Sequence, residues 1–259
     1  MIQSNRVLEK LNRGEPVIGC QIRSRAPMIA EVYGSCGFDY VFIEGEHFPY
    51  NIESVLHLIR ACECGGIEPF LRIPDHDPGK ILQYLDMGVK GMFFPHCDTG
   101  AQARAIMAAG KYAPVGARGF SNTSRATGYG MFPMDEYKAF ANKNTMMIPF
   151  IESKEAVERI DEILAAHPDA IHLGPGDLSE SYGTPASSQT VQRAIDHVIE
   201  RCAGVGIPVA APAATPEEAV TLIQRGVNMI DLSSDLMLLR AVGRSTLDSI
   251  AGALRSCSE

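Results

Sequence analysis

One stretch of the sequence is decisive for the fold: GFDYVFIEGEH, which covers residues 37–47. It opens as a short and almost wholly apolar run, Tyr40–Ile43, and it ends in Glu44, Glu46 and His47. A strand that is apolar on both faces is typical of a parallel sheet with helices on both sides. The stretch therefore predicts a buried parallel strand with polar, chemically useful side chains at its end.

Runs of the same kind recur along the chain, and amphipathic stretches typical of helices lie between them. The predicted strands are Val17–Ile22, Tyr40–Ile43, Pro69–Ile73, Gly91–Pro95, Met146–Ile151, Ala170–Leu173, Pro208–Ala211 and Met229–Leu232. The predicted helices are Ile52–Cys64, Gly79–Leu85, Ala101–Ala108, Lys154–Ala165, Val191–Ala203 and Pro216–Gln224. Eight strands in about 250 residues favour a closed (β/α)8 TIM barrel over an open doubly wound sheet. No G-x-G-x-x-G fingerprint follows a strand and no linker divides the chain, so we expect one barrel domain over residues 1–259.

Composition excludes several classes of protein. Lys and Arg number 23 against 31 Asp and Glu, a net charge of −8, whereas binding to nucleic acid requires a basic surface. No apolar run approaches the roughly 18 residues that a membrane-spanning helix needs. The first residues lack the pattern of a secretory signal, and the seven cysteines are odd in number and scattered. We therefore expect a cytoplasmic protein with reduced thiols that acts on small molecules, without nucleic acid or membrane partners.

Two carboxylates stand at the ends of predicted strands, where TIM-barrel enzymes carry their chemistry. Glu152 follows the fifth strand and Asp177 follows the sixth. On adjacent strand ends they could bind one divalent cation and leave positions for water and substrate. Both also stand where helices begin, so the alternative is that they only favour helix starts. The residues alone leave this choice open.

Three further polar side chains lie at strand ends. Arg72 could bind a substrate carboxylate through its planar fork, or it could form a structural salt bridge. His47 could act as a general base that Glu44 or Glu46 orients. His96 follows the fourth strand, and it is either a substrate contact or an ordinary solvated residue.

Glycine-rich segments supply two more candidates. Gly174, Pro175 and Gly176 precede the predicted helix that begins near Asp177, and the free amides at a helix start suit a carboxylate or a phosphate. Residues 111–144 form an irregular stretch whose first half is polar and rich in glycine. A loop of that length in a compact domain is more often functional than idle.

Taken together, these motifs resemble the HpcH/HpaI aldolase family. Besides residues 37–47, the segments that carry the resemblance are LRIP (71–74), LDMG (85–88), PVGARG (114–119), IE (151–152), GPGDLS (174–179) and DLMLL (235–239). They follow one another in order over roughly residues 16–240. The resemblance implies a metal-dependent class II pyruvate aldolase on a TIM barrel. Such an enzyme cleaves or forms a 4-hydroxy-2-oxo acid through a pyruvate enolate, and its products are pyruvate and an aldehyde.

The resemblance also implies roles for individual residues. The carboxylates that match Glu152 and Asp177 bind a divalent metal, commonly Mg²⁺, Mn²⁺ or Co²⁺, and the 2-oxo acid chelates that metal. The arginine that matches Arg72 stabilises the enolate oxygen. The histidine that matches His47 takes part in proton transfer through a bound water.

A homo-oligomer is a further implication of the resemblance. The acid that matches Asp86 reaches the site of a neighbouring subunit. Such enzymes are usually hexamers, built as trimers of dimers that exchange their last helix. Here the exchanged helix would be about Leu236–Leu254.

The chain departs from the family pattern at three places. Relatives usually have aspartate where Glu44 stands, and many have glutamine where Phe150 stands. The segment Gly119–Gly130 also differs, so the resemblance does not identify the aldehyde. Within that segment, Arg125 and Tyr129 are candidate substrate contacts, and the alternative is that they only keep the loop soluble.

Two other functions compete with the aldolase. One branch of the superfamily makes citrate for siderophores from oxaloacetate and acetyl-coenzyme A, and it too has a Pro-His pair where His96 stands. The second alternative is a non-catalytic barrel that binds a metal and an oxo acid. The joint presence of His47, Arg72, Glu152 and Asp177 argues against that last function.

Overall fold

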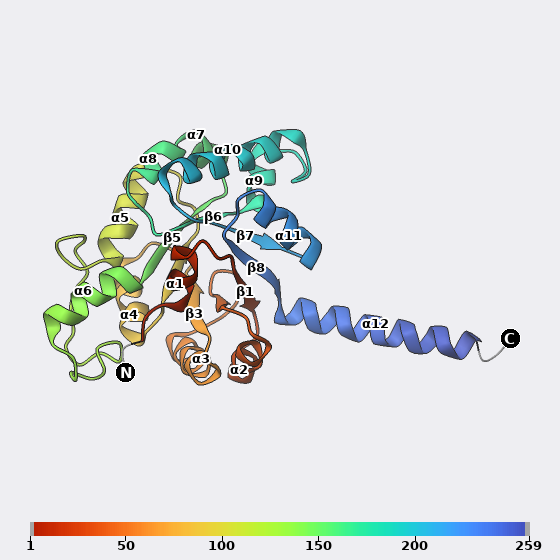
Figure 1. Cartoon of the computed structure of the whole chain (residues 1–259), viewed down its shortest axis with the longest axis horizontal. Coiled ribbons are helices and arrows are strands. Elements are labelled where there is room, and N and C mark those ends of the chain that lie inside the picture. The colour runs from red at the N-terminus through yellow and green to blue at the C-terminus, as the bar shows by residue number, and fades with distance from the viewer. Residues whose placement is uncertain (1–2, 257–259) are drawn as a thin grey trace.

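Eight parallel strands form a closed barrel in the computed structural model, which describes residues 3–256 (Figure 1). Each strand pairs with the next along the chain, and the last pairs with the first. The strands are β1 (Val17–Ile22), β2 (Tyr40–Glu44), β3 (Glu68–Arg72), β4 (Gly91–Phe94), β5 (Met146–Ile151), β6 (Ile171–Leu173), β7 (Val209–Ala213) and β8 (Met229–Ser234). The predicted (β/α)8 barrel is confirmed, and the strand boundaries differ from the predicted ones by at most two residues.

Helices alternate with the strands and surround them (Figure 1). Within residues 3–256 they are α1 (Arg6–Asn12), α2 (Pro27–Cys36), α3 (Ile52–Gly65), α4 (Pro78–Met87), α5 (Gly100–Gly110), α6 (Met134–Asn144), α7 (Lys154–Glu158), α8 (Ile160–Leu164), α9 (Pro175–Tyr182), α10 (Gln189–Val205), α11 (Pro216–Gln224) and α12 (Asp235–Ser256). Two predictions need correction. The single helix expected over Lys154–Ala165 is two helices, because the backbone at Arg159 leaves the helical region. The last 11 residues of the stretch 111–144 are the helix α6 and not an irregular loop.

Aromatic side chains fill the inside of the barrel. Among the buried residues of this inner cluster are the rings of Tyr40, Phe42, Phe70 and Phe93. A Cβ at Gly91 would lie 2.1 Å from the ring of Phe70, so only glycine leaves room for that ring. Close packing of this kind makes the barrel interior a solid core and not a pore.

The short helix α1 packs against one end of this inner core. Its Val7 is buried in the inner cluster, and Leu8 and Leu11 pack against it. The side chain of Asn5 caps the helix by accepting hydrogen bonds from the amides of Val7 and Leu8. Because α1 precedes β1, it lies at the amino ends of the strands and leaves their carboxyl ends open.

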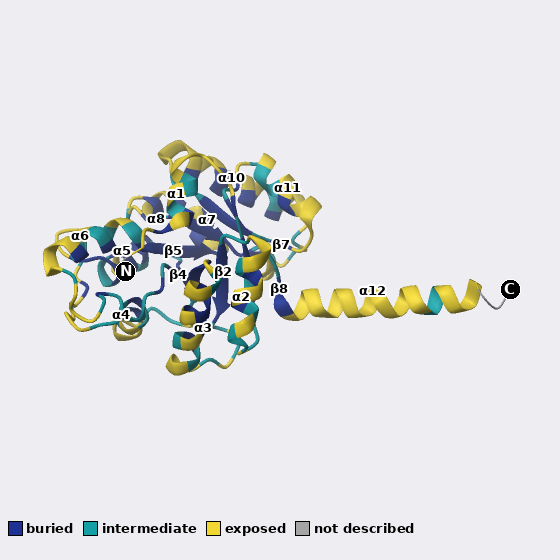
Figure 2. Ribbon diagram, turned by 60° about the horizontal axis from the view of Figure 1, so that its bottom comes forward, coloured by how far each residue is buried: buried dark blue, intermediate teal, exposed yellow. Residues whose placement is uncertain are grey.

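The last helix, α12, projects away from the barrel (Figures 1 and 2). It is exposed along most of its length and carries exposed apolar side chains, among them Leu239, Val242 and Leu247. Its amphipathic pattern is that of a helix with a packing partner. No helix in the described part of the chain is long and apolar enough to cross a membrane.

Candidate active site

The site begins with a buried carboxylate at the end of β2. Glu44 is almost fully buried and pairs in register with Arg72 at the end of β3. Its carboxylate accepts hydrogen bonds from the backbone amides of Glu46 and His47, at 2.9 and 3.3 Å. The same carboxylate accepts from Arg72, with Nε at 3.1 Å from Oε1 and Nη2 on Oε2. Glu44 therefore fixes both the loop after β2 and the guanidinium beside it.

The guanidinium of Arg72 is held on several sides. Besides Glu44, it contacts Glu46, with Nη1 3.0 Å from Oε2. Its carbon Cζ lies 5.2 Å from the ring centroid of Phe150 and 5.7 Å from that of Phe42. The sequence left open whether Arg72 binds a substrate carboxylate or forms a structural salt bridge. In the structure it forms ion pairs with Glu44 and Glu46. Arg72 is thus a rigid, preorganised cation at the carboxyl end of the barrel.

Glu46 connects the remaining groups of the site. Its carboxylate lies 3.6 Å from Nε2 of His47 and 3.2 Å from Nε2 of His96. Glu46, and not Glu44, is therefore the acid beside the ring of His47, whose side chain is 63% exposed. The sequence predicted Glu46 only as one of two acids that could orient His47. Its contact with His96 could not be predicted, because the two residues follow different strands.

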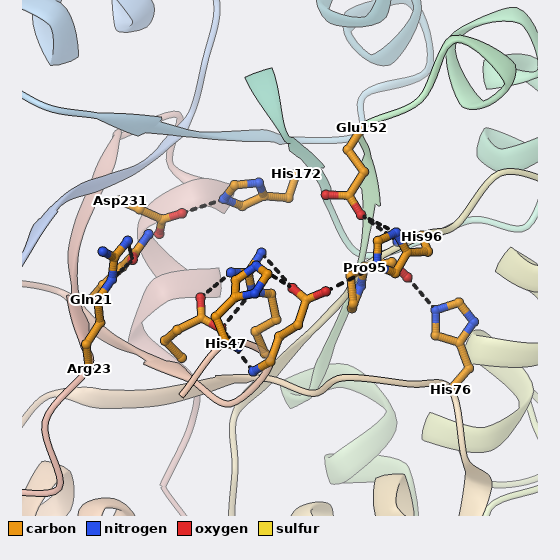
Figure 3. Close-up of polar contacts among 12 residues, drawn as sticks. Gln21, Arg23, His47, His76, Pro95, His96, Glu152, His172 and Asp231 are labelled. Carbon is orange, nitrogen blue, oxygen red and sulfur yellow. Dashed lines mark hydrogen bonds and ion pairs between the residues drawn. The ribbon is translucent and has the colours of Figure 1, made fainter. Parts of the chain in front are cut away.

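Glu152 contacts His96 at the carboxyl end of the barrel (Figure 3). Its Oε1 accepts a 2.6 Å hydrogen bond from the backbone amide of His96 and lies 3.3 Å from Nδ1 of that ring. His96 adopts a left-handed backbone conformation with φ 56°, which is uncommon for a residue other than glycine. This turn places its ring between the carboxylates of Glu46 and Glu152.

The surroundings of the Glu152 carboxylate favour the binding of a cation. The pKa of Glu152 is raised above its usual value, chiefly by burial; the amide bond from His96 and the charge of the His96 ring lower it, and the charges of Asp177 and Glu46 raise it. A Cβ at Gly174 would lie 2.6 Å from Cβ and 2.9 Å from Oε2 of Glu152, so glycine is required there. A buried carboxylate near two other acids is unfavourable unless positive charge is added.

Helix capping does not account for Glu152, whereas Asp177 lies in the first turn of α9, where the helix dipole favours an acid. Ser153, and not Glu152, caps α7, and α9 begins at Gly174 without a side-chain cap. Asp177 is exposed in the first turn of α9. Within residues 3–256 no group of three or more His, Cys, Asp or Glu side chains could hold a metal. Glu152 and Asp177 offer two carboxylates, and this donor set fits a hard cation whose other ligands are substrate and water.

Two of the predicted site residues, Asp86 and Arg125, do not lie beside Arg72 and Glu152. Arg118 donates a 2.6 Å hydrogen bond to Asp86, which lies near the last turn of α4. Arg125 forms an ion pair with Glu63 near the end of α3 and donates to the carbonyl of Met87. Helices α3 and α4 run back from the carboxyl ends of the strands, so their last turns lie at the other end of the barrel. The predicted contact between Arg125 and the substrate is therefore wrong for a site formed by one chain, because Arg125 lies at the opposite end of the barrel.

A polar network beneath the site was not predicted. Asp231 on β8 accepts a 2.5 Å hydrogen bond from the hydroxyl of Tyr40 and contacts Nε2 of His172 on β6 (Figure 3). Burial and the nearby Asp231 raise the pKa of Tyr40, so its hydroxyl keeps its proton. The ring of His172 stacks on Phe150 at 3.9 Å, beneath Arg72. The sequence did hold a signal for this network, because Tyr40, His172 and Asp231 are polar residues within the otherwise apolar strands β2, β6 and β8.

The fold and the site define a TIM-barrel enzyme whose reactive groups stand at the carboxyl ends of the strands. The chain belongs to the HpcH/HpaI aldolase/citrate lyase family, whose model matches residues 18–241. The prediction of this family, and with it of a carbon–carbon lyase of the class II aldolase type, is confirmed.

Three known proteins are similar to the chain over most of its length. It is 32% identical over 246 residues to the 2-dehydro-3,6-dideoxy-6-sulfogluconate aldolase of Pseudomonas putida, covering 93% of this chain and 95% of that protein. It is 33% identical over 239 residues to the 2-keto-3-deoxy-L-rhamnonate aldolase of Escherichia coli K12, covering 91% and 89%. The crystal structure of citrate synthase SbnG matches with a TM-score of 0.84 at 29% identity, covering 97% and 98%.

Proposed function

We propose that the protein is a metal-dependent aldolase that cleaves or forms a 4-hydroxy-2-oxo acid through the enolate of pyruvate. The observation that carries the proposal is the placing of the fixed guanidinium of Arg72 at the same end of the barrel as the buried Glu152. The two aldolases named above, of which one acts on a sulfonated and one on a deoxy sugar acid, support the same class of reaction.

Glu152 and Asp177 would hold the divalent cation, for which Mg²⁺, Mn²⁺ and Co²⁺ are the candidates. Once bound, such a cation supplies Lewis acidity at the carbonyl of the 2-oxo acid. The first turn of α9 supplies a positive helix end for the substrate carboxylate. The amide of Gly174 donates to the carbonyl of Ile151 at 3.1 Å, and Pro175 has no amide hydrogen, so within the segment 174–176 the amide of Gly176 is the donor to the substrate.

Arg72 stabilises the negative charge that develops on the enolate oxygen. Its guanidinium is already fixed by Glu44 and Glu46, so little reorganisation is needed when that charge forms. His47, with Glu46 beside its ring, moves the proton of the C4 hydroxyl in cleavage, or of the pyruvate methyl group in synthesis. His96 lies between the two carboxylates and contacts the substrate.

Enolisation of pyruvate tests the proposal without knowledge of the aldehyde. We expect proton NMR in deuterated water to show loss of the pyruvate methyl signal when protein and Mg²⁺ or Mn²⁺ are present. EDTA should stop this exchange, and fresh metal should restore it. Absence of exchange with every metal would contradict the aldolase. A non-catalytic barrel that only binds oxo acids would give this same negative result.

A second candidate is a citrate synthase-like condensation of oxaloacetate with acetyl-coenzyme A. It is favoured by the position of His96 against Glu152 and by the match to citrate synthase SbnG. Release of free coenzyme A that depends on oxaloacetate would support it. The aldolase predicts no such release.

We also propose that the chain assembles through α12 into a homo-oligomer, a hexamer built from dimers. Leu239, Val242 and Leu247 of α12 are exposed, and Met28 and Val32 on α2 and Val220 on α11 are exposed apolar side chains of helices that contact β1, β7 and β8. A second copy of α12 would cover such side chains. Assembly would also allow Asp86 to act in the site of another subunit.

A change of charge on α12 tests this assembly. Leu239→Asp combined with Val242→Asp should lower the mass measured by light scattering and reduce methyl exchange, because buried carboxylates without partners oppose the contact. Arg244→Asp is the matched control, because it changes the charge by the same two units on the side of α12 away from Leu239 and Val242, and it should keep the wild-type mass. An unchanged mass in the double variant would contradict the role of α12.

A further inference from the structure

We propose that Arg23, held by Gln21, binds an anionic group at the far end of the aldehyde substrate. Gln21 lies in β1 and Arg23 follows it directly after the strand, so both stand at the carboxyl end of the barrel. The inference rests on the proposed aldolase and narrows its substrates to aldehydes that carry a carboxylate or a similar oxyanion.

Neutral groups hold the guanidinium of Arg23 in place. Its Nε and Nη2 donate to Oε1 of Gln21, at 3.2 and 2.9 Å. Its carbon Cζ lies 5.6 Å from the ring centroid of Phe48. These contacts occupy one side of the guanidinium and leave the paired N–H groups of Nη1 and Nη2 at its end. That pair has the geometry for two parallel hydrogen bonds to a carboxylate.

The charge of Arg23 is not neutralised. Among the residues that the structure describes, no salt bridge reaches Arg23, whereas Arg72 contacts two carboxylates. Asp235, at the start of α12, accepts 3.0 Å hydrogen bonds from the backbone amides of Arg23 and Ser24. It therefore anchors the main chain of this loop and not the guanidinium. A partly buried, oriented and unpaired guanidinium is a binding site for an anion.

The position of Arg23 matches the far end of the substrate. Figure 3 shows Gln21 and Arg23 on the opposite side of the site from Glu152 and His96, with His47 between them. If the 2-oxo acid lies at Glu152 and the reacting carbons lie near His47, the remainder of the substrate extends toward β1. The guanidinium of Arg23 then meets the group at its far end.

Paired aldehydes test this subsite. With pyruvate and metal, kcat/KM should be higher for succinic or glutaric semialdehyde, whose carboxylates stand at the far end, than for the neutral pentanal or hexanal. Arg23→Gln should lower kcat/KM for the carboxylated aldehydes about 10- to 100-fold, the range expected for hydrogen bonds to a charged group. Its effect on the neutral aldehydes should be several times smaller. Arg25→Gln is the matched control, because Arg25 is exposed in the same loop, and both rates should stay at the wild-type values.

The outcomes separate this inference from the proposed function. Equal losses for charged and neutral aldehydes in Arg23→Gln, or no preference for the carboxylated ones in the wild type, would overturn the subsite. Pyruvate methyl exchange in the wild type reports the aldolase itself, because no aldehyde is present. Exchange without a preference therefore rejects only the subsite, whereas absence of exchange rejects the aldolase on which it rests.

Discussion

Glu152→Ala is expected to abolish cation binding and pyruvate methyl exchange together. The variant removes the buried one of the two proposed carboxylate ligands and leaves only the exposed Asp177. Groups that only orient a metal ligand are worth about 10- to 100-fold in affinity or activity, so loss of a ligand itself should exceed about 100-fold. Titration with Mn²⁺ followed by electron paramagnetic resonance measures the binding, and NMR measures the exchange.

Glu155→Ala is the matched control for this change. Glu155 is an exposed acid in α7 that pairs with Arg159 one turn later. Its removal should leave Mn²⁺ affinity and exchange unchanged, since exposed pairs of this kind contribute little. Wild-type Mn²⁺ affinity in Glu152→Ala would place the cation elsewhere and contradict the proposed ligand set.

Arg72→Ala should damage both catalysis and stability. Loss of a preorganised donor to the enolate oxygen should lower the maximal exchange rate by roughly 10²- to 10³-fold. The same change leaves the buried carboxylate of Glu44 without its cation, and removal of one partner of a buried pair costs about 3–5 kcal/mol in the free energy of unfolding. Exchange at saturating pyruvate and urea unfolding measure the two effects.

Two further variants separate these effects. Arg72→Lys keeps the charge beside Glu44 but lacks the planar fork, so it should recover more of the stability than of the rate. Arg201→Ala removes an exposed ion pair with Asp161 and should change the free energy of unfolding by less than about 1 kcal/mol. Exchange at the wild-type rate in Arg72→Ala would show that Arg72 has no part in enolisation.

Much of the fold could be predicted because the barrel strands are short and apolar on both faces. This pattern marks each strand, and β1, β5 and α11 begin and end at the predicted residues. The break at Arg159 could not be predicted, since Lys154–Ala165 has a continuous helical pattern and the break depends on the backbone of one residue. In the stretch 111–144 the glycine-rich first half concealed the helix α6 that follows it.

The site could be predicted in part because parallel strands end at one face of a barrel. Strand ends alone bring Glu44, Arg72, His96 and Glu152 together. Side-chain partners could not be read from spacing. Arg125, for example, lies at the other end of the barrel, where it pairs with Glu63 near the end of α3.

The network of Tyr40, Asp231 and His172 has a consequence for how the barrel closes. A β-strand that slips by one residue turns each inward side chain outward, so a shift of β8 would remove Asp231 from the interior. The hydroxyl of Tyr40 and the ring of His172 would then be buried without their partner, at a cost of about 1–3 kcal/mol for each group. An interior built only of apolar side chains would penalise such a slip far less. The network therefore selects one register for three strands, and this register sets the relative heights at which β2 and β6 present Glu44 and Gly174 to the substrate.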